Sequence, residues 1–179
     1  MINQFTGQTV PMKKSMTELW RQSTQVAALS MVLSKQLKIV ISKRARLAGL
    51  IHNVGAMAIL AYSGRFLESD PELSNLQFIL DKLRGQVGVI VINQWGLGAD
   101  FVEVVLEADN PGRDHLGAID YADIVITAKL ILDASKGSRD SKHPLQQAKI
   151  WSMTPEAEEA GFGLEILNQA RCEIDELMQ

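Results

Sequence analysis

Polar groups that could do chemistry lie on helix faces that ought to be buried. His52 and Asn53 stand side by side inside the stretch ARLAGLIHNVGAMAIL, which is otherwise mostly aliphatic and small. Gln22 and Ser23 fall within an earlier apolar pattern of helical spacing, so at least one of them faces the core. Asp123 falls on the apolar line of a later helix. A carboxylate there is costly unless it is paired or hydrogen-bonded.

These groups allow two interpretations. In the first, each is satisfied separately: His52 bonds a carbonyl, Gln22 caps a backbone group and Asp123 meets an arginine. In the second, residues on three helices share one polar cavity. Metal sites in helical bundles are built from inward residues on facing helices, so three such groups together favour the shared cavity.

The elements that would position these groups are helices almost throughout, which predicts an all-α fold. We expect one compact bundle of about six to seven helices. Ser15 and Glu18 fit a capping box at the start of the first helix. The predicted helices run from Ser15 to Leu37, Ser42 to Ser63, Leu76 to Leu83 and on through Trp95, Ala99 to Ala108, Leu116 to Ala134, and Leu164 to Met178.

The β-branched run VGVIVIN suits a strand by propensity alone. We predict a buried helix instead, because Val87, Val91 and Trp95 recur at helical intervals. A lone strand among helices would also have no partner.

Composition excludes several classes of protein. The 179 residues carry a net charge of -3, with 46% hydrophobic and 22% charged residues, as in an ordinary globular domain. The basic footprint of a nucleic-acid-binding protein is absent. No membrane-spanning or signal segment is expected. The one cysteine, Cys172, cannot form a disulfide within the chain, so we expect a reducing cytoplasm.

The order of motifs resembles a known family. LWRQSTQVAALSMVLSKQL and ARLAGLIHNVGAMAIL, then VGVIVINQWGLGADFVEVVLEADNP and YADIVITAK, resemble successive blocks of the HDOD domain, the HD-related output domain of bacterial signalling proteins. The resemblance covers residues 19–135, and a helix over 164–178 suits it. It implies a single domain over 1–179 without the family's usual N-terminal helical subdomain, either a truncated member or part of a longer protein.

HD phosphohydrolases, to which this family is related, hold divalent metal on His and Asp residues. The resemblance places their site positions on the following residues: Gln22, His52, Asn53, Arg84, Asp109 (of the pair Ala108-Asp109) and Asp123. Only His52 and Asp123 keep a metal-ligand type of the family, and a cation at Arg84 would repel a metal. We therefore expect no catalytic residue, no metal and no cofactor.

The same mapping yields a hypothesis about Arg84. Its guanidinium could take the place of the lost metal and pair with the buried carboxylate of Asp123. The alternative is that Arg84 points to solvent beside Lys82.

The resulting functional prediction is a non-catalytic signalling module of bacterial cytoplasm that binds a partner protein. The partner is unknown, and a homodimer is left open; no nucleic acid or membrane is expected. One rival is a residual metal-dependent phosphohydrolase. Another is a sensor that binds a small, nucleotide-like ligand in the vestigial cavity.

Overall fold

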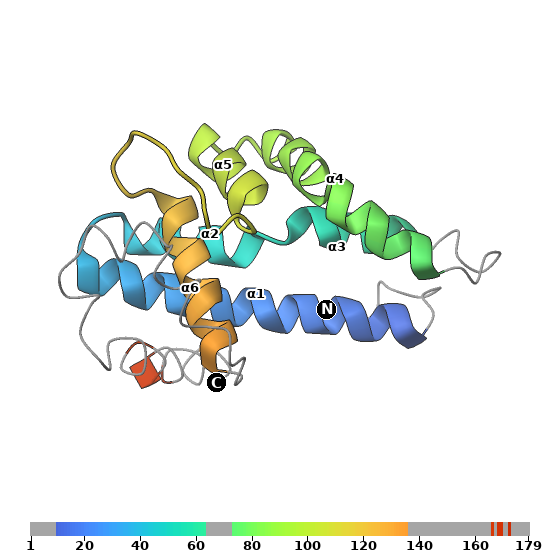
Figure 1. Ribbon diagram of the computed structural model, residues 1–179, viewed down its shortest axis with the longest axis horizontal. Helices are drawn as coiled ribbons and strands as arrows, with labels where there is room; N and C mark the ends of the chain where they lie inside the picture. The colour runs from blue at the N-terminus through green and yellow to red at the C-terminus, as the bar shows by residue number, and fades with distance from the viewer. Residues whose placement is uncertain (1–9, 64–72, 136–165, 167, 170–171, 173–179) are drawn as a thin grey trace.

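The computed structural model describes residues 10–63, 73–135, 166, 168, 169 and 172. These residues form helices without any strand, so the predicted all-α fold is confirmed (Figure 1). The helices are α1 (Val10–Leu37), α2 (Ser42–Ile51), α3 (Val54–Ser63), α4 (Leu73–Gln94), α5 (Ala99–Glu107) and α6 (Tyr121–Ser135).

Each helix packs on its neighbours around one hydrophobic core. α1 runs along the long axis of the molecule and packs on α2 and α6, while α3 packs on α4, α4 on α5 and α5 on α6 (Figure 1). Leu29 and Leu33 of α1, Phe101 of α5, and Ile124 and Ile131 of α6 are fully buried in that core. Burial of such side chains is the main favourable term in folding.

Glycines set how closely two of these helix pairs approach. A Cβ on Gly49 of α2 would lie 2.6 Å from the Cα of Ala27 in α1. A Cβ on Gly55 of α3 would lie 1.8 Å from the carbonyl oxygen of Arg84 in α4. Backbones can come this close only where a side chain is absent. Because these glycines flank the turn between α2 and α3, they fix that turn against both α1 and α4.

Two predicted helix boundaries are wrong. α1 already begins at Val10, so Ser15 lies inside the helix and does not head a capping box there. The predicted helix from Ser42 to Ser63 is broken at His52 and Asn53, which form a turn between α2 and α3. The polar pair thus stands where one helix ends and the next begins.

The β-branched run is helical, as predicted, and forms the second half of α4. Its burial was overestimated: Ile92 is fully buried, but Ile90 is 68% exposed. The predicted helix start at Leu116 is also wrong, because α6 begins at Tyr121 and Leu116 is fully exposed.

The predicted helix from Leu164 to Met178 lies mostly outside the described residues, as do residues 136–163. Among the described positions, Ile166 is buried and the Gln36 amide donates a hydrogen bond to Gln169 at 3.0 Å. Length and composition alone would let Ser42–Ser63 cross a membrane, but 56% of its apolar window is buried, as in the core helix of a folded domain.

Candidate functional site

His52 and Asn53 occupy the turn between α2 and α3, and both are buried, with 5% and 6% of their surface exposed. The Nδ1–H of His52 donates to the carbonyl oxygen of Gly49 at 2.7 Å, because a carbonyl can only accept. This bond is local to the end of α2. The other ring nitrogen, Nε2, is buried and has no hydrogen-bond partner among the described residues. His52 therefore presents one unused lone pair to its surroundings.

A cavity of about 610 Å³ opens next to this turn. It contains four of the six positions that the resemblance assigned to the HD site: Gln22, Asn53, Arg84 and Asp109. The Asn53 amide donates to the side-chain oxygen of Gln22 at 3.4 Å, a long bond between two neutral amides. The other lining residues are Lys14, Ser15, Glu18, Leu19, Ala56, Leu60, Leu76, Gln77, Leu80, Asp81, Lys129 and Asp133. A shared polar cavity is therefore present, although its membership differs from the prediction.

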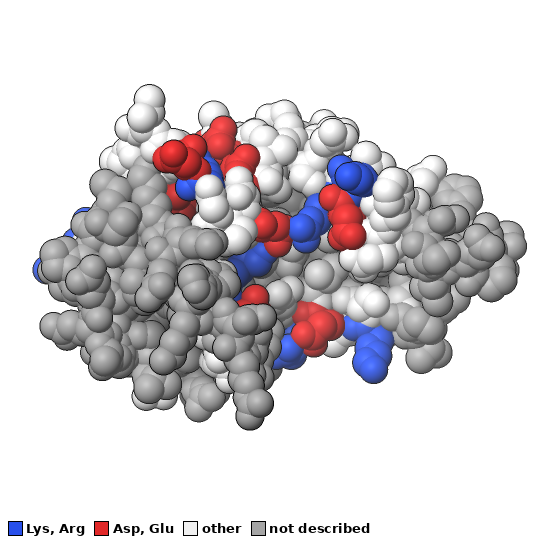
Figure 2. Space-filling view, in the orientation of Figure 1, with Lys and Arg blue, Asp and Glu red and all other residues white. Residues whose placement is uncertain are grey.

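Arg84 pairs with Asp109 and not with Asp123, so that hypothesis is wrong. The Arg84 guanidinium lies 2.8 Å from Oδ2 of Asp109, and the ammonium of Lys129 bonds Oδ1 of the same carboxylate. Burial alone would raise the pKa of Asp109, but Lys129 and Arg84 outweigh it and hold that pKa below its usual value. Basic and acidic side chains interleave across the middle of this face (Figure 2).

Burial, helped by the nearby charge of Lys129, lowers the pKa of His52 from 6.5 to about 4. The charges of Asp109 and the Gly49 carbonyl act the other way and are too weak to compensate. The ring is therefore neutral at pH 7, with its proton on Nδ1 and its lone pair on Nε2.

The pKa of His52 predicts a loss of stability in weak acid. Between pH 6.5 and about 4 the unfolded state binds a proton on His52 that the folded state does not, so the free energy of unfolding falls as pH falls. Protonation of His52 in the unfolded state lowers the free energy of unfolding by about 3 kcal/mol over this pH range. Urea unfolding of the wild type and of His52→Gln at pH 7 and at pH 4 should show the larger loss in the wild type. Equal losses in both proteins would contradict the assignment.

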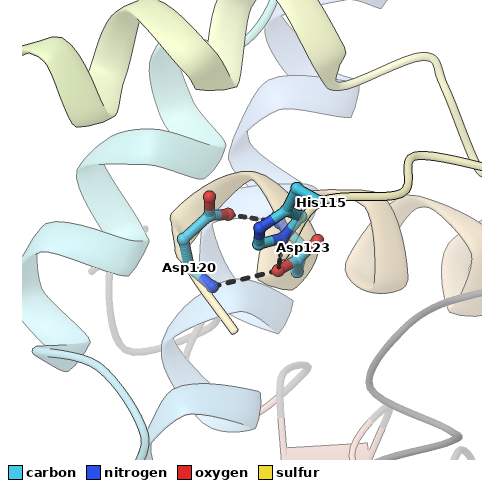
Figure 3. A group of neighbouring side chains, drawn as sticks. All are labelled: His115, Asp120 and Asp123. Carbon is cyan, nitrogen blue, oxygen red and sulfur yellow. Dashed lines mark hydrogen bonds and ion pairs between the residues drawn. The ribbon is translucent and has the colours of Figure 1, made fainter. Parts of the chain in front are cut away.

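Asp123 lies outside the cavity, at the start of α6 (Figure 3). Oδ1 of Asp120 accepts the backbone N–H of Asp123 at 3.1 Å, and Oδ2 of Asp123 accepts the backbone N–H of Asp120 at 3.0 Å. This reciprocal pair is a capping box. The predicted shared cavity therefore does not include Asp123, whose carboxylate serves the helix terminus.

Arg113 and His115, from the loop before α6, complete the environment of Asp123. The Arg113 guanidinium lies 3.0 Å from Oδ1 of Asp123 and 2.8 Å from Oδ2 of Asp120, and His115 Nε2 lies 2.9 Å from Oδ2 of Asp123. Arg113 is only 9% exposed. Ligand atoms of His115, Asp120 and Asp123 lie within 4.8 Å of one another, as a metal site requires. Because Arg113 already pairs with both carboxylates, the cluster fits an ion-pair network that fastens the loop to α6.

Neither this ion-pair network nor the pairing of Lys129 with Asp109 was predicted from the sequence. The predicted helix from Leu116 to Ala134 placed Asp123 well inside a helix, and Arg113 and His115 were given no role. Two aspartates three residues apart, Asp120 and Asp123, were the available signal, since acidic residues at this spacing are typical of the start of a helix. A lysine within the apolar segment YADIVITAKLIL was the signal for Lys129.

The sequence of the first two thirds of the chain decides the family. The model of the HDOD domain matches residues 1–111. The chain belongs to the HDOD family. No curated protein matches this HDOD chain significantly.

A solved structure also resembles this HDOD chain, and the likeness shows a shared fold. It is the crystal structure of a Shewanella amazonensis SB2B protein whose name assigns it provisionally to the metal-dependent phosphohydrolases. The TM-score is 0.72 at 20% sequence identity, over 95% of this chain. The match spans 63% of the Shewanella protein, so the HDOD chain corresponds to only part of it.

The residues in the cavity do not fit the divalent metal that HD phosphohydrolases hold. Asn53 and Gln22 offer neutral amide oxygens where the HD site uses an aspartate and a histidine. Arg84 and Lys129 have no lone pair to give, and both oxygens of Asp109 are already bound to them. Of the HD-site positions in the described part of the chain, only His52 keeps an unengaged imidazole or carboxylate donor atom, Nε2, and divalent metals need several. The other carboxylates that line the cavity, those of Glu18, Asp81 and Asp133, lie outside these positions.

Proposed function

We propose that this chain is a non-catalytic regulatory module that acts in bacterial signal transduction by binding a partner protein. The observation that carries the proposal is the pairing of Arg84 with Asp109 at the position where HD phosphohydrolases need metal ligands. A guanidinium 2.8 Å from the carboxylate supplies the positive charge that a metal would bring, without the ability to activate water. Membership of the HDOD family supports the same proposal.

Exposed apolar side chains support the binding part of the proposal. Ile79, Leu83 and Ile90 lie along one face of α4 and are 37%, 42% and 68% exposed. Trp20 of α1 is 56% exposed. Exposed aromatic and aliphatic groups of this kind are common where proteins bind one another. We propose a cytoplasmic signalling protein as the partner, and light scattering of the purified chain distinguishes a homodimer from a monomer.

The cavity favours a second candidate function, the sensing of a small ligand. A volume of about 610 Å³ with several charged and amide groups falls in the range of ligand pockets. Arg84 would have to leave Asp109 in order to clamp an anion. Thermal-shift measurements with a nucleotide panel separate the candidates, because only a sensor is stabilised by a ligand.

The non-catalytic proposal is tested by hydrolysis assays with matched proteins. Wild type and His52→Ala are purified in parallel and assayed on phosphomonoester and phosphodiester substrates with Mg²⁺, Mn²⁺, Ni²⁺ or Zn²⁺ added. We expect the two proteins to give the same background rate. Metal-dependent turnover by the wild type that disappears in His52→Ala would establish a phosphohydrolase instead.

A further inference from the structure

Lys129 of α6 is a second cation at Asp109, and the sequence motifs assigned it no role. Its ammonium bonds Oδ1 of Asp109, and its side chain is only 13% exposed. It lines the same cavity as Gln22, Asn53 and Arg84. A lysine that is largely covered needs a partner to offset its loss of hydration, and Asp109 is that partner.

Asp109 is held from two sides by groups on different helices. It follows α5 directly, Arg84 comes from α4 and Lys129 comes from α6. Each carboxylate oxygen has its own cation, with Arg84 on Oδ2 and Lys129 on Oδ1. The arrangement therefore ties the end of α5 to both neighbouring helices.

His52 places a neutral lone pair next to these charges. Its Nε2 is buried and has no partner among the described residues, while Nδ1 is committed to Gly49. Lys129, Asp109 and Arg84 are the charged groups that act on the ring, and Lys129 acts most strongly. The imidazole thus presents the donor atom that a transition metal prefers, beside a carboxylate that is already neutralised.

We propose that the ammonium of Lys129, together with the guanidinium of Arg84, occupies the carboxylate of Asp109 and keeps divalent metal out of this site. The inference rests on the proposed non-catalytic function and adds Lys129 to Arg84 as a residue that maintains it. An ammonium and a divalent cation compete for the same carboxylate, and their charges repel one another at short range. Loss of the charge of Lys129 frees Oδ1 of Asp109, whose charge acts on the imidazole of His52, and Nε2 of that imidazole has no partner among the described residues.

Nickel titration of Lys129→Met tests this directly, because Ni²⁺ favours imidazole with oxygen ligands. Isothermal titration calorimetry and the shift in melting temperature report binding without any assay of activity. We expect Lys129→Met to bind Ni²⁺ at least about tenfold more tightly than the wild type, as removal of one nearby positive charge predicts. Lys82→Met, which removes an exposed lysine of α4, should match the wild type.

Further variants show where the ion binds and keep the test possible if Lys129→Met does not fold. The gain should disappear in the double variant Lys129→Met with His52→Gln, and Lys129→Arg should exclude Ni²⁺ as the wild type does. If Lys129→Met does not fold, Lys129→Gln keeps an amide donor for Asp109 and carries the same expectation. A gain that survives loss of His52, or no gain at all, would overturn the inference. Tight, His52-dependent binding by the wild type would overturn the proposed function as well.

Discussion

Gly55→Ala is expected to destabilise the protein by about 3 kcal/mol, since overpacking of a close backbone contact costs this much or more. The new Cβ would lie 1.8 Å from the carbonyl oxygen of Arg84 and 2.6 Å from the backbone nitrogen of Gly88. Both are backbone atoms, so no side chain can rotate away, and α3 and α4 must separate. Chemical denaturation of wild type and variant measures the loss.

Gly85→Ala is the matched control for this prediction. It also places a methyl group on a helical glycine, but the nearest atom is Cδ2 of Leu106 at 3.4 Å, an ordinary contact. Alanine is favoured over glycine in a helix by about 1 kcal/mol, so this variant should be neutral or slightly stabilised. Equal behaviour of the two variants would show that the crossing of α3 and α4 is not as close as described.

Arg113→Met should cost about 3 kcal/mol of folding free energy, the scale for removing one partner of a buried ion pair. The guanidinium is 9% exposed and is 3.0 Å from the carboxylate of Asp123, which is 3% exposed. Its loss leaves that carboxylate with His115 and the backbone N–H of Asp120. Thermal or urea unfolding at pH 7 gives the magnitude.

Arg21→Met provides the comparison for Arg113. Arg21 forms an ion pair with Glu18 on the exposed surface of α1, at 2.5 Å and with 49% of its side chain exposed. Exposed pairs contribute about 0 to 1 kcal/mol. A loss for Arg113→Met as small as that for Arg21→Met would mean that the network around Asp123 does not stabilise the loop.

The sequence identified the elements of this fold well because their signals are local. Helical periodicity gave the all-α class, and the β-branched half of α4 was assigned to a helix because a lone strand would lack a partner. The exposure of Ile90 was missed, since an apolar residue on a helix looks the same whether or not a neighbour covers it. Only the packing of α3 and α5 on α4 decides which of its faces is buried.

The candidate site was predicted only in part, because its contacts join distant segments. Gln22, Asn53, Arg84 and Asp109 do line one cavity, with His52 next to it. The predicted ion-pair partner of Arg84 was wrong, because sequence spacing does not say which of two carboxylates a side chain reaches. An error of five residues in the start of α6 placed Asp123 inside a helix, where its carboxylate had no local role. At a helix terminus the same carboxylate is a cap.

Under the proposed function, ion pairs between helices take the structural role that a metal has in HD phosphohydrolases. Such a metal would hold together side chains from several helices, and its loss would leave their carboxylates uncompensated. In this chain Arg84 and Lys129 compensate Asp109 instead, from α4 and α6. His52 keeps its place through the bond to Gly49, which needs no metal.

The measurement that tests the central claim most directly is the metal content of the wild-type protein, prepared without chelator and without an affinity tag that binds metal. Elemental analysis for Mg, Mn, Fe, Ni, Co and Zn is compared with His52→Ala purified in the same way. We expect that no metal exceeds a small fraction of the protein concentration and that the two proteins do not differ. A stoichiometric metal in the wild type that is lost in His52→Ala would contradict it.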